Sequence, residues 1–108
     1  MKIPESHVQR AFDILMSSDH ATARAAYEFS EKNLKVVLAK AAAASNAKTV
    51  SERENEAMRS PEYMEALENY RLLAKAYFEA RDKREAANAV LDGWRTLSAD
   101  QRALEKVR

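Results

Sequence analysis

Residues 60–96, SPEYMEALENYRLLAKAYFEARDKREAANAVLDGWRT, decide the fold because they read as one long helix. Ser60 offers a side-chain oxygen as an N-cap, and Pro61 stands at the first helical position, where its missing N–H costs nothing. From there, residues at spacings of three and four form a seam that is apolar except at Arg84. The seam consists of Tyr63, Ala66, Tyr70, Leu73, Tyr77, Ala80, Arg84, Ala87, Leu91 and Trp94.

The same segment carries apolar side chains on a second side. Leu67 and Ala74 widen the seam, and a further strip consists of Met64, Leu72, Phe78, Ala86 and Val90. A helix that is apolar on two sides needs partners on two sides, so we expect a homo-oligomer. The candidate residues for its interface are Tyr63, Tyr70, Leu73, Tyr77, Phe78 and Trp94.

Residues 20–44 predict a partner helix for this segment. Their heptad seam consists of Ala23, Tyr27, Ser30, Leu34, Val37, Ala41 and Ala44. A structured turn at residues 45–60 would fold the two helices antiparallel, with Leu34 near Arg71 or Leu72. The predicted hairpin leaves the far end of the long helix uncovered.

Three short helices complete the prediction, at residues 4–16, 51–59 and 99–107. The first has one apolar face, and we expect its Phe12 and Leu15 to meet Leu91 and Trp94. Capping boxes start the other two: Thr49–Glu52 or Ser51–Glu54 before the second, and Ser98–Gln101 before the third. Gly93 marks either a close crossing or the end of the long helix, which we predict at residue 96.

The predicted fold is therefore all-α, a long antiparallel helical hairpin with short flanking helices that assembles into an oligomeric helical bundle. A chain of 108 residues makes one domain, covering residues 1–108 with helices at 4–16, 20–44, 51–59, 61–96 and 99–107.

The composition argues against an enzyme. Without cysteine there is no thiolate ligand or thiol nucleophile, and a single glycine cannot build a phosphate-binding loop. His7 and His20 each stand alone, and the serines sit at predicted caps. We expect no catalytic residue, metal, cofactor or small-molecule substrate. No apolar run is long enough for a membrane span and no signal peptide is evident, so we expect a cytoplasmic protein without a membrane partner.

The net charge is only +1, but its distribution is uneven. Residues 32–51 hold four lysines and no acid. Such a pattern is either a solvated mixed-charge surface or a basic stripe that assembly multiplies into a track for a polyanion. The seven-residue period of Tyr63, Tyr70 and Tyr77 is likewise open between helix packing and stacking of nucleic-acid bases. The candidate nucleic-acid contacts are Lys32, Lys35, Lys40, Lys48, Arg53 and Arg95.

A resemblance rests on KTVSERENEA at residues 48–57, SPEY at 60–63, the charged helix that follows, and WRT at 94–96. Over about residues 30–100, the chain is similar to small helical proteins encoded by bacteriophages, some regarded as relatives of the UvsY-type recombination mediators. The matching positions are Lys48, Glu52, Arg53, Ala57, Tyr63, Trp94 and Arg95.

The resemblance implies an oligomeric accessory protein that binds single-stranded DNA. Such a mediator helps to load a recombinase onto DNA already coated by single-strand-binding protein, and a phage-encoded copy would act in the host cytoplasm. Among the matching positions, Lys48, Arg53 and Arg95 are the cations that could contact phosphate. This chain departs from the pattern in being nearly neutral. The alternative is a helical protein–protein interaction module, such as a phage adaptor or inhibitor, without direct DNA binding.

Overall fold

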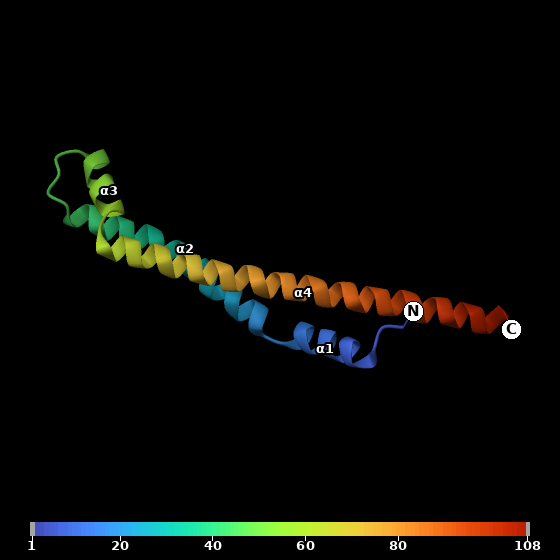
Figure 1. Ribbon diagram of the computed structural model, residues 1–108. Helices are drawn as coiled ribbons and strands as arrows, with labels where there is room; N and C mark the ends of the chain where they lie inside the picture. Colours follow the sequence, from blue (N-terminus) through green and yellow to red (C-terminus); the bar gives the residue numbers. More distant parts are fainter. Residues whose placement is uncertain (1, 108) are drawn as a thin grey trace. The chain divides into compact units, whose positions relative to one another are not determined.

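The chain is all-α in the computed structural model, which describes residues 2–107. Of these residues, 89% are helical and none lies in a strand. The helices are α1 (Glu5–Met16), α2 (Asp19–Ala44), α3 (Val50–Met58) and α4 (Pro61–Val107) (Figure 1). Their contacts divide the chain into two compact units. The first, Ala21–Phe78, is called the α2–α3 unit; the second, called the α1 unit, combines residues up to His20 with those from Glu79 onward.

The predicted break between residues 96 and 99 is wrong, because α4 continues without interruption to Val107. Ser98 lies inside the helix and is half-buried, so its capping box with Gln101 is not used. No proline or glycine stands between Trp94 and Gln101, and the backbone keeps its helical hydrogen bonds where nothing in the sequence breaks them. The other predicted bounds agree with the observed ones to within one residue.

Two side-chain caps fix the start of α3 and the start of α4. The N–H of Glu52 donates to Thr49 Oγ1 over 3.1 Å, so Thr49 is the N-cap of α3. Ser51 lies inside that helix, so the alternative capping box does not start it. The N–H of Tyr63 donates to Ser60 Oγ over 3.2 Å, as the sequence predicts for the start of α4.

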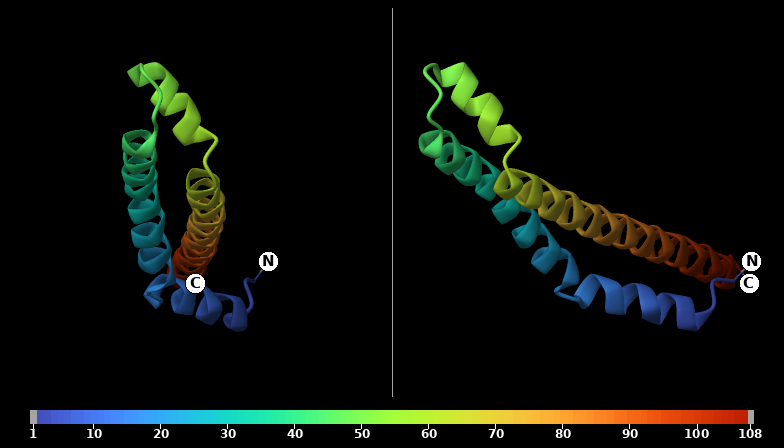
Figure 2. Two further views of the ribbon diagram at one scale, coloured as in Figure 1. Left: turned by 90° about the vertical axis from the view of Figure 1, so that its left-hand side faces the viewer. Right: turned by 60° about the vertical axis from the view of Figure 1, so that its left-hand side comes forward.

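In the α2–α3 unit, α2 packs against the first part of α4. The ring of Tyr27 lies 5.6 Å from that of Tyr70, 5.0 Å from that of Tyr77 and 5.8 Å from that of Phe78. These rings place the early part of α2 beside residues 70–78 of α4. The end of α2 lies beside the start of α4, where Ala44 and Ser60 line the same pocket. The two helices therefore run in opposite directions within this unit (Figures 1 and 2).

In the α1 unit, α1 packs against the later part of α4. Its buried core consists of Val8, Ala11, Ala87 and Leu91, with Ile3, Ile14, Leu15 and Val90 around it. The rings of Phe12 and Trp94 meet edge to face with centroids 6.4 Å apart. The predicted contact of Phe12 with Trp94 is therefore confirmed.

Two unusual residues of α4, the charged Arg84 in the seam and the glycine at position 93, have local explanations. The guanidinium of Arg84 donates to the carbonyl oxygen of Leu15 over 3.3 Å, near the end of α1, where carbonyls lack partners in the helix itself. A Cβ atom on Gly93 would lie 3.2 Å from Ile3 Cδ1. Since α4 runs through Gly93, this glycine marks a close crossing and not a helix end.

Candidate interaction surfaces

Five of the six candidate nucleic-acid contacts belong to the α2–α3 unit. Three lysines lie on α2, one lies in the connection to α3, and Arg53 lies on α3 itself. We call the four lysines the lysine set: Lys32, Lys35, Lys40 and Lys48. Arg95 belongs to the α1 unit, where its guanidinium lies 3.5 Å from the carboxylate of Asp92.

All members of the lysine set are exposed, and none forms an ion pair within residues 2–107. Glu28 stands four residues before Lys32 but pairs with Arg24 instead, at 2.9 Å. This hydrogen bond raises the pKa of Arg24 above its ordinary value. The lysine set therefore remains available to an external anion.

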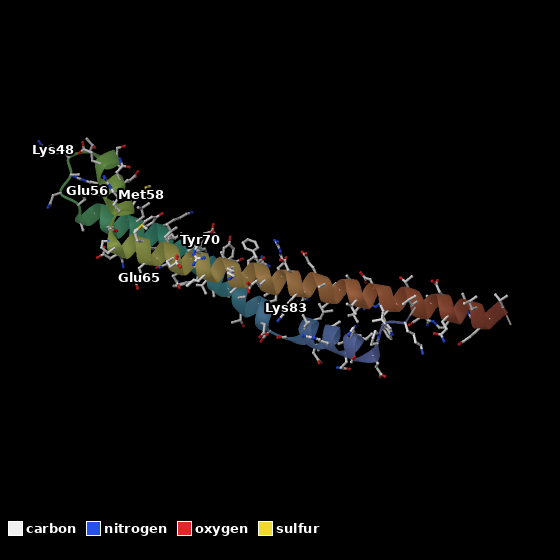
Figure 3. The ribbon with its side chains drawn as sticks, viewed as in Figure 1. Lys48, Glu56, Met58, Glu65, Tyr70 and Lys83 are labelled. Atoms are coloured by element: carbon white, nitrogen blue, oxygen red, sulfur yellow. The ribbon has the colours of Figure 1, made fainter. Side chains whose placement is uncertain are left out.

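Hydrogen bonds order the connection that carries Lys48. Ser45 Oγ donates to the carboxylate of Glu56 and accepts the N–H of Ala47 over 3.2 Å. Arg53 Nε donates to the carbonyl oxygen of Ala47 over 2.7 Å. Figure 3 shows Lys48 at the outer side of this connection. Arg53 therefore stabilises the connection between α2 and α3 by its hydrogen bond, whereas the Lys48 side chain extends outward from this connection.

The tyrosines of α4 pack within their own unit. Tyr70 and Tyr77 are half-buried against Tyr27, and the Tyr27 and Tyr77 rings are nearly parallel, at 12°. The hydroxyls of Tyr27 and Tyr70 lie 3.4 Å apart. Their hydrogen bond, with a contribution from burial, raises the pKa of Tyr27 to about 12. These contacts account for Tyr70 and Tyr77 by helix packing; stacking of bases on the tyrosines stays a prediction.

The described structure leaves large apolar side chains exposed on α4. Met64 is 53% exposed, Leu67 38% and Phe78 41%. Together with Arg71 and Ala74, they line an open groove of about 510 Å³. We call these five residues the α4 strip. Phe78 is among the interface residues predicted from the sequence, whereas Met64 and Leu67 are not, although the spacing 64, 67, 71, 74, 78 is itself a heptad pattern.

An ion pair accommodates the charge in the middle of the α4 strip. Arg71 makes two hydrogen bonds to the carboxylate of Glu68, at 2.6 and 3.0 Å. This pairing lowers the pKa of Glu68 and raises that of Arg71. Each charge is therefore balanced within one helical turn.

The remaining interface candidates differ in exposure. Tyr63 and Leu73 are half-buried in the seam, and Trp94 is 38% exposed in the α1 unit. Trp94 also lines a groove of about 720 Å³ with Ile3 and Phe12. A role for any of these residues between copies stays a prediction.

Residues 2–107 contain no group of three metal-ligating side chains that could hold an ion. Over the same residues, no helix combines the length and the apolar character that crossing a membrane requires. No protein-family model, no curated protein and no solved structure matches this chain.

Proposed function

We propose that this chain is an accessory protein, without enzymatic activity, that binds single-stranded DNA as a homo-oligomer and assists the loading of a recombinase. The observation that carries the DNA-binding part is the lysine set, four exposed ammonium groups in one unit without an ion pair among the described residues. The recombinase and the single-strand-binding protein enter as partners through the sequence resemblance alone.

Assembly is part of this proposal because one copy offers few cations. Each lysine that neutralises a phosphate releases a counterion, and these contacts contribute additively to the salt dependence of binding. The chain as a whole carries a net charge of only +1. In the proposed oligomeric bundle, built from an antiparallel hairpin of α2 and α4, each copy adds its own lysine set to one track.

The test is a fluorescence-anisotropy titration of a labelled oligo-dT with the full chain at several salt concentrations. We expect binding that weakens as salt rises. When all four residues of the lysine set are changed to Gln, the negative slope of log affinity against log salt should become less steep by about 3 for each bound copy. This corresponds to four phosphate contacts at about 0.7 each. Glutamine retains helix propensity, so the variant should keep its helical content by circular dichroism.

A matched control removes the same number of charges from the α1 unit. The exposed residues for this control are Lys2, Lys83, Arg102 and Lys106, each changed to Gln. The control should lose much less of the salt slope than the variant of the lysine set. Equal losses in the two variants would mean unspecific charge attraction, and salt-independent or absent binding by the unchanged chain would refute the proposal.

The second candidate function is a helical protein–protein interaction module. It is favoured by the α4 strip, whose large apolar side chains the chain leaves 38–53% exposed. This alternative predicts no salt-dependent anisotropy change with the oligonucleotide, while substitutions in the α4 strip abolish association with a helical partner. The two candidates therefore depend on different residues of one unit.

A further inference from the structure

The α4 strip has the form of one half of a coiled-coil contact. Its residues recur at spacings of three and four from Met64 to Phe78, about 21 Å along the helix axis at 1.5 Å per residue. The neighbouring seam of Tyr63, Tyr70 and Tyr77 is more buried. Its Tyr70 and Tyr77 lie against Tyr27 of α2, which Phe78 at the end of the α4 strip also contacts. The helix therefore carries two heptad stripes, of which its own chain buries the seam more fully and leaves Met64, Leu67 and Phe78 of the other 38–53% exposed.

We infer that the α4 strip is covered by the same strip of a second copy, packed antiparallel about a two-fold axis that passes between Arg71 and Ala74. The charges beside the strip favour this arrangement, because the exposed residues Glu68 and Lys75 stand one heptad apart. In an antiparallel pair, Glu68 of each copy lies opposite Lys75 of the other, and two-fold symmetry makes this contact twice. In a parallel, in-register pair, like charges would meet at both positions.

The sizes of the side chains fit the same arrangement. In antiparallel packing, Leu67 of one copy meets Phe78 of the other, and Arg71 meets the small Ala74. Glu68 already binds the Arg71 guanidinium, so the charge of Arg71 stays paired and partly exposed to solvent. The aliphatic part of the Arg71 side chain can then cover apolar surface of the second copy. In these layers a large side chain thus faces a medium or small one.

The inference makes a quantitative prediction for size in solution, measured by sedimentation velocity of the full chain without DNA. We expect a weak dimer with a dissociation constant on the order of 10 μM, because two heptads cover less than the standard interface of about 800 Å² per partner. Leu67→Glu should weaken the dimer about a hundredfold. The two-fold symmetry means that the contact is lost at two places, and a tenfold loss at each corresponds to about 1.4 kcal/mol.

The matched control is Leu72→Glu. Leu72 lies on the same helix and is 51% exposed, but it stands outside the α4 strip. This variant should dimerise as the unchanged chain does. A chain that stays monomeric at millimolar concentration, or a control as damaging as Leu67→Glu, would overturn the inference.

Charge exchange tests the antiparallel direction. Glu68→Lys and Lys75→Glu should each weaken the dimer, because each places like charges opposite one another in both symmetric contacts. The double variant Glu68→Lys/Lys75→Glu again places opposite charges between the copies, so it should dimerise more tightly than either single variant, although it lacks the Glu68–Arg71 pair. In a parallel pair, each of these positions faces its own copy, so like charges meet before and after a single substitution and the affinity should not change. Single variants with unchanged affinity would therefore overturn the antiparallel arrangement.

The inference rests on the homo-oligomer of the proposed function but not on DNA binding. Sedimentation without DNA and anisotropy with oligo-dT separate the two. A stable dimer that binds no oligonucleotide would refute only the DNA proposal, whereas a monomer that binds it would refute only the pairing of the α4 strips.

Discussion

Replacing Leu91 by alanine should remove much of the stability of the α1 unit. Leu91 is only 2% exposed, and its neighbours in the buried core are Val8, Ala11 and Ala87. Two of these neighbours are alanines that cannot move in to fill a void, so the substitution leaves a cavity as well as losing apolar burial. We expect a loss of about 3 kcal/mol in the free energy of unfolding, within the range for buried leucines.

The assay is urea denaturation followed by circular dichroism at one fixed protein concentration, combined with amide hydrogen exchange. Exchange should accelerate most in α1, whose packing against α4 depends on this core. Leu104→Ala is the control, because Leu104 is 68% exposed and should change stability by less than about 0.5 kcal/mol. A Leu91→Ala variant as stable as this control, with unchanged exchange in α1, would refute the described core.

Three further predictions concern single contacts. Thr49→Ala removes the cap of α3 and should cost about 1 kcal/mol in urea denaturation, whereas Thr49→Ser should cost little. Tyr70→Phe removes the hydrogen bond that raises the pKa of Tyr27 to about 12, so a tyrosinate absorbance titration should show that pKa falling toward 10. In the unchanged chain, the raised pKa means that the stabilisation from protonated Tyr27 is present below pH 10 and is lost as pH rises through about 12. Gly93→Ala should gain up to about 1 kcal/mol from helix propensity, because the Ile3 side-chain end at 3.2 Å can rotate away; lower thermal stability would show that Ile3 cannot move.

The helix starts could be predicted because they depend on neighbouring residues. Ser60 and Pro61 specify the start of α4 without any tertiary contact, and Thr49 does the same for α3. The end of α4 could not be predicted in this way. Ser98 and Gln101 form a capping pattern only if the chain leaves the helix before them, and both are also acceptable inside a helix.

The lysine set shows a similar division between local and tertiary information. The absence of acids between residues 32 and 51 is visible in the sequence and indicates where unpaired cations gather. The sequence does not decide which cation takes Glu28, since Arg24 and Lys32 both stand four residues from it. Arginine binds a carboxylate through a planar, delocalised guanidinium group, and in the structure Arg24 pairs with Glu28. Lys32 is therefore left exposed to solvent without this partner.

The two stripes of α4 differ in one residue that decides which of them the chain buries. The seam and the α4 strip have the same period and are offset by a single position, as Tyr63 and Met64 illustrate. Periodicity therefore cannot rank them. Between residues 61 and 78, the seam contains no charge, whereas the strip has Arg71 in its middle, and burying a guanidinium costs several kcal/mol unless it is fully paired. Packing α2 on the tyrosine seam avoids this cost, and it leaves at the surface the stripe whose charges a second, antiparallel copy can match.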